Sequence, residues 1–359
     1  MARIYNFSAG PAVLPVAALQ EAQADLVEYQ GSGMSILEMS HRGKEYEAVH
    51  NEAVENIRKL LNLPENYAVL FMTGGATAQF ALIPMNLRGE GQIADYINTG
   101  AWASKAIKEA KLLGQVNIVA NTEHECPTRM PDASTLKFTP GAAYTHITSN
   151  ETIAGTQWRS FPRPESPLVA DMSSDILSRP MDVTQFGLIY AGAQKNLGPA
   201  GVTLVIIRKD LVERASGKCP MIFRYKTHME ENSLHNTPPC FSIYMLALCT
   251  RWLLNLGGVD AIAKINREKA EKLYAAIDAS SFYKGAAVKE FRSDMNVTFR
   301  LPTEAQEELF VKEASTQKLK GLKGHRSVGG IRASIYNAFP AAGVDALIAF
   351  MKDFEKRNG

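Results

Sequence analysis

The sequence predicts an α/β protein with a large domain built on a mainly parallel sheet and a smaller α+β domain towards its C-terminal end. Two observations lead to this prediction. Up to about residue 210, short apolar segments of strand length alternate with longer helix-like segments, which is typical of a parallel sheet covered by helices on both faces. After about residue 258, long helical segments are separated by single strand-like segments, which indicates a second unit of typical small-domain size.

The expected elements follow from these apolar segments. Strands of the large domain are expected at 67–73, 94–99, 142–148, 167–173, 188–193 and 201–208. The last two are joined by a connection too short to hold a helix, so we expect that pair to be antiparallel. In the second unit, helices are expected at 258–278, from Glu304 onward and at 342–357, with strands at 295–301 and 329–336. We therefore expect a large domain at 16–258 and a small domain formed by 1–15 and 259–359.

Composition excludes several classes of function. The 359 residues include 39 basic and 37 acidic side chains, without a basic run, so neither nucleic acid nor a membrane surface is expected as a partner. The N-terminus lacks the apolar segment of a secretory signal, and the longest apolar stretches are of strand length. Four cysteines without paired spacing predict neither a disulfide framework nor a metal site: Cys126, Cys219, Cys240 and Cys249. A cytoplasmic enzyme acting on small molecules fits these features.

Asp171 and Lys195 are the residues that most strongly suggest catalysis. Asp171 ends one expected strand, and Lys195 follows the next within the glycine-rich segment 192–201. Because ligands of open α/β sheets collect at the carboxyl ends of strands, both side chains can face one ligand. Pyridoxal 5′-phosphate (PLP) needs a lysine amine for a Schiff base and a carboxylate for its pyridine nitrogen. The ordinary alternative is a solvated lysine and a capping aspartate.

A phosphate site is expected where residues 71–80 run from a strand through a Gly-Gly turn into a helix. The first N–H groups of a helix have no partner inside it, so those of Ala76 and Thr77 can bind a phosphate. The helix dipole contributes only about 0.3–1 kcal/mol, so further donors such as Gln194 are expected. Alone, this pattern is equally typical of a plain tight turn.

Trp102 and Thr152 are further candidates for cofactor contacts. Trp102 begins the helical segment after the strand at 94–99, where its ring can stack on a flat heteroaromatic ring. Thr152 follows another strand and can donate a hydrogen bond to the phenolic oxygen of that ring. A tryptophan at the rim of the core and an ordinary loop threonine are the alternatives.

A series of segments, taken in order, matches a known family. The chain resembles the phosphoserine aminotransferases, which are PLP-dependent class V aminotransferases. The resemblance runs nearly from end to end, and the order and spacing of the segments are very specific. It implies the PLP-dependent transferase fold type I, with a mostly parallel seven-stranded sheet in the large domain. The segments are 6–12, 40–47, 74–80, 100–110, 149–158, 169–183, 190–201, 236–239 and 323–340.

The resemblance implies a role for each candidate residue. Lys195 is the Schiff-base lysine and Asp171 pairs with the pyridine nitrogen, while Trp102 stacks on the ring and Thr152 contacts its substituents. The cofactor phosphate is held by Ala76, Thr77 and Gln194. Some members of the family carry a third glycine and a basic or small residue at 76–77, so no charged side chain is expected to act there.

Two further residues imply a second subunit. By resemblance, Asn236 and Thr237 contact the phosphate of the cofactor in the neighbouring subunit. The active site is therefore expected to be shared within a homodimer.

Anion-binding residues are expected for the substrates. Arginine presents a planar fork that suits both carboxylate and phosphate, and histidine can add a hydrogen bond. The resemblance implies that Arg332 binds the α-carboxylate of the substrate. It also implies that two His-Arg pairs, His41–Arg42 and His325–Arg326, form the pocket for the distal anion. Surface ion pairs are the alternative for each pair.

The expected reaction transfers an amino group from L-glutamate to 3-phosphohydroxypyruvate, giving O-phospho-L-serine and 2-oxoglutarate, a step of serine biosynthesis. A side role in pyridoxal phosphate biosynthesis, on 4-phosphohydroxy-L-threonine, stays open. The alternatives are another transaminase of the same fold, such as an alanine–glyoxylate or serine–glyoxylate aminotransferase, a cysteine desulfurase, and a binding protein without catalysis. Cys240 is a poor candidate for the mobile cysteine of a desulfurase, because it directly follows the expected cofactor contacts.

Overall fold

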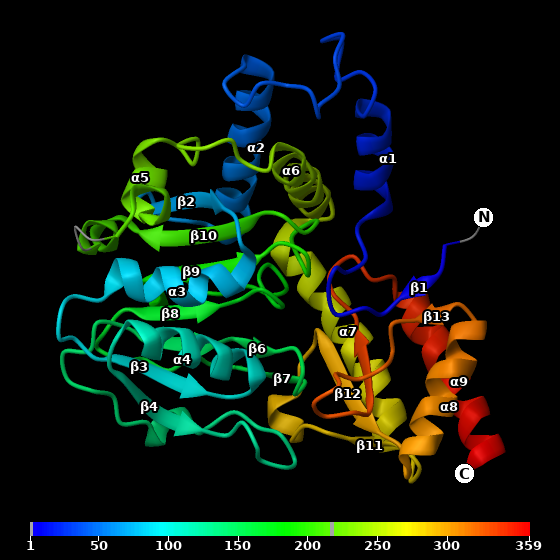
Figure 1. Ribbon diagram of the computed structural model, residues 1–359. Helices are drawn as coiled ribbons and strands as arrows, with labels where there is room; N and C mark the ends of the chain where they lie inside the picture. Colours follow the sequence, from blue (N-terminus) through cyan, green and yellow to red (C-terminus); the bar gives the residue numbers. More distant parts are fainter. Residues whose placement is uncertain (1–2, 216–218) are drawn as a thin grey trace.

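A seven-stranded sheet forms the centre of the larger part of the molecule (Figure 1). The computed structural model describes residues 3–215 and 219–359. Strand β10 is antiparallel to both of its neighbours, and the other neighbouring strands run parallel. In spatial order the strands are β2 (Tyr67–Met72), β10 (Thr203–Arg208), β9 (Leu188–Gly192), β8 (Leu168–Asp171), β5 (Thr145–Thr148), β3 (Ala94–Asn98) and β4 (Val116–Asn121).

The predicted fold class is confirmed. Each of the six expected strands is present, and the pair at 188–193 and 201–208 is antiparallel as expected. The sequence analysis missed β4. It lies at the edge of the sheet, and its residues are only half-buried or exposed, so it lacks the continuous apolar run of the inner strands.

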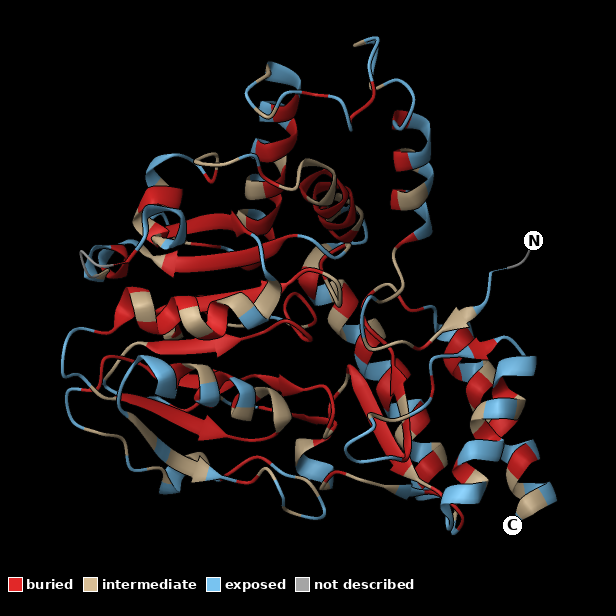
Figure 2. Ribbon diagram, viewed as in Figure 1, coloured by how far each residue is buried: buried red, intermediate tan, exposed pale blue. Residues whose placement is uncertain are grey.

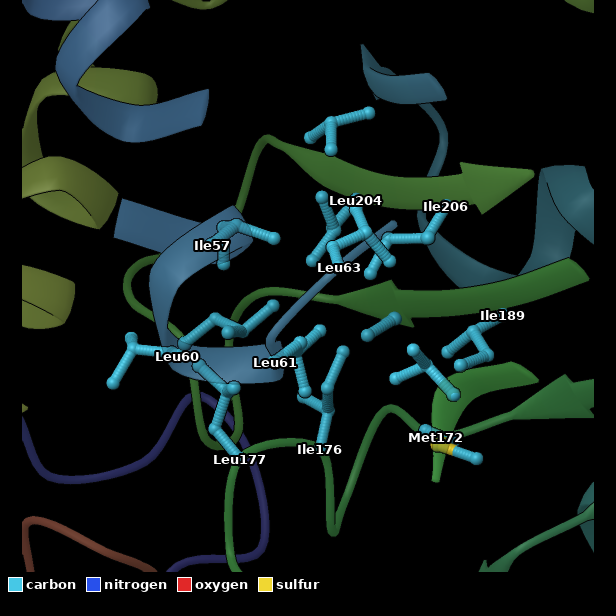
Figure 3. Close-up of a cluster of buried hydrophobic side chains, with 14 of the residues drawn as sticks. Ile57, Leu60, Leu61, Leu63, Met172, Ile176, Leu177, Ile189, Leu204 and Ile206 are labelled. Carbon is cyan, nitrogen blue, oxygen red and sulfur yellow. The ribbon is translucent and has the colours of Figure 1, made fainter. Parts of the chain in front are cut away.

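Helices cover both faces of the sheet, whose strands are largely buried (Figure 2). Helices α3 (Gly75–Leu87) and α4 (Ala101–Leu113) pack on one face, and α2 (Lys44–Leu61), α6 (Cys240–Asn255) and the first part of α7 (Gly258–Asp278) pack on the other. In Figure 3, Ile57 and Leu61 of α2 lie in one cluster with Leu204 of β10. Burial of such a side chain contributes about 1.5–3 kcal/mol, and the three-to-four-residue spacing of the buried positions directs one face of α2 to the sheet.

A second, smaller core lies beside the carboxyl ends of the parallel strands (Figure 1). A three-stranded antiparallel sheet contains β11 (Lys284–Gly285), β12 (Asn296–Arg300) and β14 (Ile331–Ser334). It packs with α7, α8 (Glu304–Thr316) and α9 (Ala341–Asn358). The N-terminal strand β1 (Tyr5–Asn6) pairs with β13 (Leu319–Lys320), so the start of the chain lies on this smaller core.

The remaining elements are short or peripheral. They are α1 (Val16–Asp25), α5 (Tyr225–Glu230), the hairpin β6 (Asn150–Glu151) and β7 (Thr156–Gln157), and 3-10 turns at Ala133–Thr135, Val183–Gln185, Lys209–Arg214, Met221–Phe223 and Lys289–Phe291. Among the described residues, no single helix has the length and apolarity needed to cross a membrane. Helices α6 and α7 meet that criterion only as a pair bent by 83°.

Candidate active site

The carboxyl ends of the parallel strands bring the candidate residues to one edge of the sheet, facing the smaller core (Figure 1). The turn after β2 carries Gly74, and the loops after β3 and β5 lead to Trp102 and Thr152. Strand β8 ends on Asp171, and Lys195 follows β9. Parallel strands end at the same edge, so segments far apart in sequence meet at one place.

Asp171 is buried and held by its own turn. Its Oδ1 accepts hydrogen bonds from the Ser173 backbone N at 2.9 Å and from the Ser173 hydroxyl at 2.7 Å. Burial raises the pKa of Asp171, while the Lys195 ammonium and these hydrogen bonds oppose the rise. The carboxylate is thus fixed in orientation by a neighbour two residues away, and it depends on nearby donors to remain charged.

Lys195 interacts electrostatically with Asp171. Its Nζ donates a hydrogen bond to the Thr152 hydroxyl at 2.7 Å and lies 5.1 Å from the centre of the Trp102 ring. Burial lowers the pKa of Lys195 to about 8, although Asp171 and Glu151 both favour the charged amine. An amine with a lowered pKa spends more time neutral near physiological pH, and only the neutral form can act as a nucleophile or base.

The first turn of α3 offers backbone donors. Gly74 has a φ of +88°, and a Cβ there would lie only 2.5 Å from the Ala78 Cβ, so the turn requires glycine. No side chain caps this helix, which leaves the N–H groups of Ala76 and Thr77 available to an anion. Gln194 is half-buried and directly precedes Lys195 in the chain.

A cavity of about 670 Å³ opens between the large sheet and the smaller core and is lined in part by Arg332, His325 and Ala154. The Arg332 Nη1 donates to the Thr152 carbonyl oxygen at 3.5 Å, which ties this cavity to the Lys195 pocket. The Nδ1 of His325 accepts a hydrogen bond from the Ser327 backbone N at 3.2 Å, so its Nε2 is the nitrogen left for a ligand.

The lining of this cavity also includes Glu123 and Glu125, but positive charge gathers around His325. Burial and the neighbouring charges of Arg332, Arg326 and Lys105 lower the pKa of His325. Lys105 also lies over the Trp102 ring, with its Nζ 4.2 Å from the ring centre. Such a cluster favours an anionic ligand, since each cation is stabilised when an anion binds.

Several candidates do not join this cluster within one chain. His41 and Arg42 lie in the loop before α2, and among the described residues no hydrogen bond or ion pair joins either to Lys195 or Arg332. Asn236 lines a separate cavity of about 310 Å³ beside Gly74, and Thr237 is exposed.

Glu151 and Lys105 are residues that the sequence analysis missed. Glu151 of β6 is buried and contacts the start of α4. Its Oε1 accepts hydrogen bonds from the Thr99 hydroxyl at 3.2 Å and the Ala103 backbone N at 3.3 Å. Burial raises the pKa of Glu151 to about 7. No local pattern marks Glu151, whereas the position of Lys105 three residues after Trp102 puts both on one helical face.

Replacing Glu151 with glutamine is expected to change the unfolding free energy of the cofactor-free protein in a pH-dependent way. Relative to the wild type, the variant should be more stable at pH 8 than it is at pH 5. The native carboxyl keeps its proton up to about pH 7, whereas the unfolded one loses it near its ordinary value of 4.5. The wild type therefore loses stability as pH rises through this window, and the neutral variant does not. We expect the difference in unfolding free energy to grow by about 2–3 kcal/mol, measured by urea unfolding.

The exposed Glu65 provides the control for this titration. The Glu65→Gln variant should show a difference from the wild type that does not change between pH 5 and pH 8. A flat pH profile for Glu151→Gln would contradict the buried, proton-holding carboxyl described above.

Comparisons with known proteins identify the family. A family model for class-V aminotransferases matches residues 4–347. This chain belongs to the class-V aminotransferase family. The aminotransferase is 54% identical to a phosphoserine aminotransferase of Desulfosudis oleivorans, with 99% of each chain covered. It also resembles the solved structures of phosphoserine aminotransferases from Bacillus circulans subsp. alkalophilus (52% identity, 99% of each chain, TM-score 0.96) and Trichomonas vaginalis (43% identity, 98% and 100% covered, TM-score 0.94, with PLP bound).

The family resemblance predicted from the sequence is thus confirmed, and the aminotransferase uses pyridoxal phosphate. Its own residues fit that cofactor. Lys195 and Asp171 share one pocket under Trp102, and uncapped N–H groups of α3 lie at the same edge of the sheet. Among the described residues, the buried Trp102 Nε1 and Arg332 Nε have no partner. These donors are available to bound molecules.

Proposed function

We propose that this aminotransferase transfers the amino group of L-glutamate to 3-phosphohydroxypyruvate, giving O-phospho-L-serine and 2-oxoglutarate, and so serves serine biosynthesis. The observation that carries the proposal is the cationic cavity that adjoins Lys195. Arg332 contacts the loop of Thr152, and His325 lies among the positive charges of Arg332, Arg326 and Lys105. A substrate with an anion at each end and a reacting carbon between them fits this arrangement. The full-length likeness to phosphoserine aminotransferases supports the same substrates.

We assign the chemical steps to two residues. Bound PLP supplies an aldehyde that binds amines and a cationic ring that withdraws electrons from the carbon next to the amine. With PLP bound, the Lys195 amine would hold the cofactor through its aldehyde and, once released by the substrate amine, would take the proton from the substrate Cα. The Asp171 carboxylate holds the ring nitrogen in its protonated form. A contact of opposite charges shifts a pKa by roughly 1–3 units, so this pairing favours the cationic ring.

The remaining cofactor contacts orient the ring and its phosphate. Trp102 stacks on the ring, and the Thr152 hydroxyl, which contacts the Lys195 Nζ at 2.7 Å, donates to its phenolic oxygen. The phosphate is held by the backbone N–H groups of Ala76 and Thr77 and by the side chain of Gln194. Backbone donors suit a phosphate because they need no counter-charge and cannot rotate away.

The substrate is oriented by its two anions. Arg332 binds the α-carboxylate that glutamate and phosphohydroxypyruvate share, and its buried unpaired Nε is consistent with a planar fork awaiting a carboxylate. His325 and Arg326 bind the distal anion. Arginine accommodates both a carboxylate and a phosphate at that end, which lets one pocket serve both substrates.

A homodimer would complete this site. Among the described residues, no hydrogen bond or ion pair joins His41, Arg42, Asn236 or Thr237 to Lys195 of the same chain, so we propose that they act in the site of the other subunit. Exposed apolar side chains in the same regions support a covered face, since large exposed patches mark interfaces. Leu26, Val27, Met34 and Leu37 precede His41, and Met221, Ile222 and Phe223 precede Asn236.

The domain division and the cellular location are also proposals. The smaller part has a hydrophobic cluster of its own, which includes Phe7, separate from the clusters of the larger part. This supports a large domain at 16–258 and a small domain of 1–15 with 259–359. A cytoplasmic enzyme is consistent with four free cysteines, since reducing compartments keep thiols unpaired. A side role on 4-phosphohydroxy-L-threonine, in pyridoxine biosynthesis, would use the same anion-binding residues.

Purified enzyme is expected to prefer 3-phosphohydroxypyruvate over unphosphorylated oxo acids by about 10²-fold or more in kcat/KM, because charged hydrogen bonds to the phosphate contribute about 1.5–3 kcal/mol each. The measurement is a coupled assay of 2-oxoglutarate formation from glutamate. Equal turnover of pyruvate or glyoxylate, or faster turnover with alanine as donor, would contradict the proposal and favour an alanine–glyoxylate-type transaminase.

A further inference from the structure

A row of polar side chains lies inside the sheet face that α3 and α4 cover. Paired residues of parallel strands point to the same face, and the register pairs Asp171 with Tyr190, His146 with Val169, and Tyr96 with His146. Tyr96 on β3, His146 on β5 and Tyr190 on β9 therefore face the same side of the sheet as Asp171, which ends β8 between the strands of His146 and Tyr190. All three are at most 1% exposed. A cluster of buried apolar side chains surrounds them on this face, and Figure 2 shows these strands as buried, so polar groups here need a reason.

These side chains form a polar chain that leads to Asp171. His146 Nε2 lies 2.9 Å from the Tyr190 hydroxyl oxygen. Tyr190 stands opposite Asp171 on the neighbouring strand and faces the same side of the sheet, and its hydroxyl interacts with the Asp171 carboxyl group. The His146 ring stacks on Tyr96, with ring centres 4.9 Å apart and planes at 23°. The imidazole is thus held flat against one neighbour with its Nε2 aimed at Tyr190.

The donors in this series of side chains all point the same way, from His146 through Tyr190 to Asp171. Burial lowers the pKa of His146 to about 3, so the ring is neutral and only one nitrogen carries a proton. Among the described residues, the buried Nδ1 has no partner. A buried N–H without a partner is rarer and costlier than an unpaired acceptor, so the proton sits on Nε2. His146 then donates to the Tyr190 oxygen, which leaves the Tyr190 proton for Asp171.

Asp171 needs such donors because its surroundings oppose its charge. Burial raises its pKa, and two further buried acids, Asp175 and Glu151, interact with it electrostatically. Lys195 favours the charge, but its amine is engaged in the reaction. Ser173 and Tyr190 remain as donors throughout, and each is backed by a second buried donor: the Gly192 backbone N donates to the Ser173 hydroxyl at 3.0 Å, and His146 Nε2 contacts the Tyr190 hydroxyl.

We propose that Tyr190 and His146 are positioning residues that act in series to keep Asp171 ionised, and thereby keep the ring nitrogen of the bound cofactor protonated. The inference rests on the proposed pairing of Asp171 with that nitrogen. Hydrogen bonds in a chain strengthen one another, so donation by His146 makes the Tyr190 hydroxyl a better donor.

The variants that test this are Tyr190→Phe, His146→Phe and the double variant. Phenylalanine removes the donors and keeps an aromatic ring at both positions, with the same ring as tyrosine at 190 and a slightly larger ring than imidazole at 146. Tyr144→Phe is the matched control, because the Tyr144 hydroxyl is buried on the same face and bonds to the Tyr96 hydroxyl at 2.8 Å, outside the chain to Asp171. Each protein is reconstituted with ring-¹⁵N-labelled PLP. The readouts are the ¹⁵N chemical shift of the ring nitrogen against pH and the dissociation constant of the cofactor.

Tyr190→Phe is expected to lower the midpoint pH of ring-nitrogen protonation by about one unit and to weaken cofactor binding about tenfold, the usual effect of a hydrogen bond to a charged group. His146→Phe should give a smaller change of the same sign. The double variant should match Tyr190→Phe, since two groups in series are not additive. Tyr144→Phe should leave both readouts at wild-type values, even if the folded protein is less stable.

Two outcomes would overturn the inference: a wild-type ¹⁵N profile in Tyr190→Phe, or an equal change in Tyr144→Phe, which would indicate loss of packing alone. Asp171→Ala separates this failure from failure of the proposed site. If Asp171→Ala changes the ¹⁵N profile and Tyr190→Phe does not, only the role of Tyr190 and His146 is wrong. If Asp171→Ala also leaves the profile unchanged, the pairing of Asp171 with the ring nitrogen is wrong.

Discussion

Replacing Lys195 with alanine is expected to lower kcat by about 10⁴-fold or more, because one side chain holds the cofactor and also moves the proton, and general acid–base catalysis alone contributes about 10²–10⁴-fold. The Nζ of Lys195 is the amine in the pocket of Asp171, Thr152 and Trp102. Single-turnover measurements with glutamate separate the loss of the proton transfer from slow product release.

Arginine at position 195 should not restore activity, since a guanidinium stays charged and cannot accept the proton. The exposed Lys108 of α4 is the control, and Lys108→Ala should retain wild-type kcat. Borohydride reduction followed by peptide mapping should place a pyridoxyl group on Lys195 of the wild type and on no residue of Lys195→Ala. An adduct on another lysine would overturn the assignment of the cofactor-binding residue.

Much of the fold could be predicted because its strands are buried on both faces. Continuous apolar runs such as 201–208 need no partner information to be recognised as strands. The helix at 258–278 was predicted with the bounds that the structure gives to α7. The edge strand β4 was missed because its half-buried and exposed residues give no continuous apolar run, and β1 and β13 contain only two residues each. Pairing between distant segments creates such strands, and no local pattern specifies it.

The cofactor site was predictable for a related reason. Asp171 and Lys195 stand at the carboxyl ends of neighbouring strands, so strand positions alone bring them together. The residues that support them were not predicted. Glu151 accepts a hydrogen bond from the Ala103 backbone N in α4, which is far from it in the sequence. His146 contacts Tyr190 only because of the order in which the strands lie in the sheet. Burial then sets their charge, and burial of a polar residue cannot be inferred from its neighbours in sequence.

Replacing Arg332 with alanine is expected to lower kcat/KM by about 10²–10³-fold for glutamate and for 3-phosphohydroxypyruvate alike, since loss of one partner of a buried charge pair costs about 2–5 kcal/mol. Both substrates carry the α-carboxylate, so both half-reactions lose the same contact. Arg332 is half-buried beside the Thr152 loop, its Nε has no partner, and burial lowers its pKa. The negative charge of a bound carboxylate would offset the cost of burying the charged Arg332 side chain.

Comparing the loss of kcat/KM for glutamate with the loss for 3-phosphohydroxypyruvate makes this prediction specific to the α-carboxylate. Arg332→Lys should recover only part of the loss, because an ammonium keeps the charge but not the bidentate geometry. Arg326→Ala should instead impair the two substrates unequally, because the distal groups differ in charge and shape. The exposed Arg163 is the control, and Arg163→Ala should retain wild-type kinetics. If Arg332→Ala impaired only the phosphorylated substrate, Arg332 would bind the phosphate, and the orientation of the substrate in the cavity would be the reverse of the one proposed.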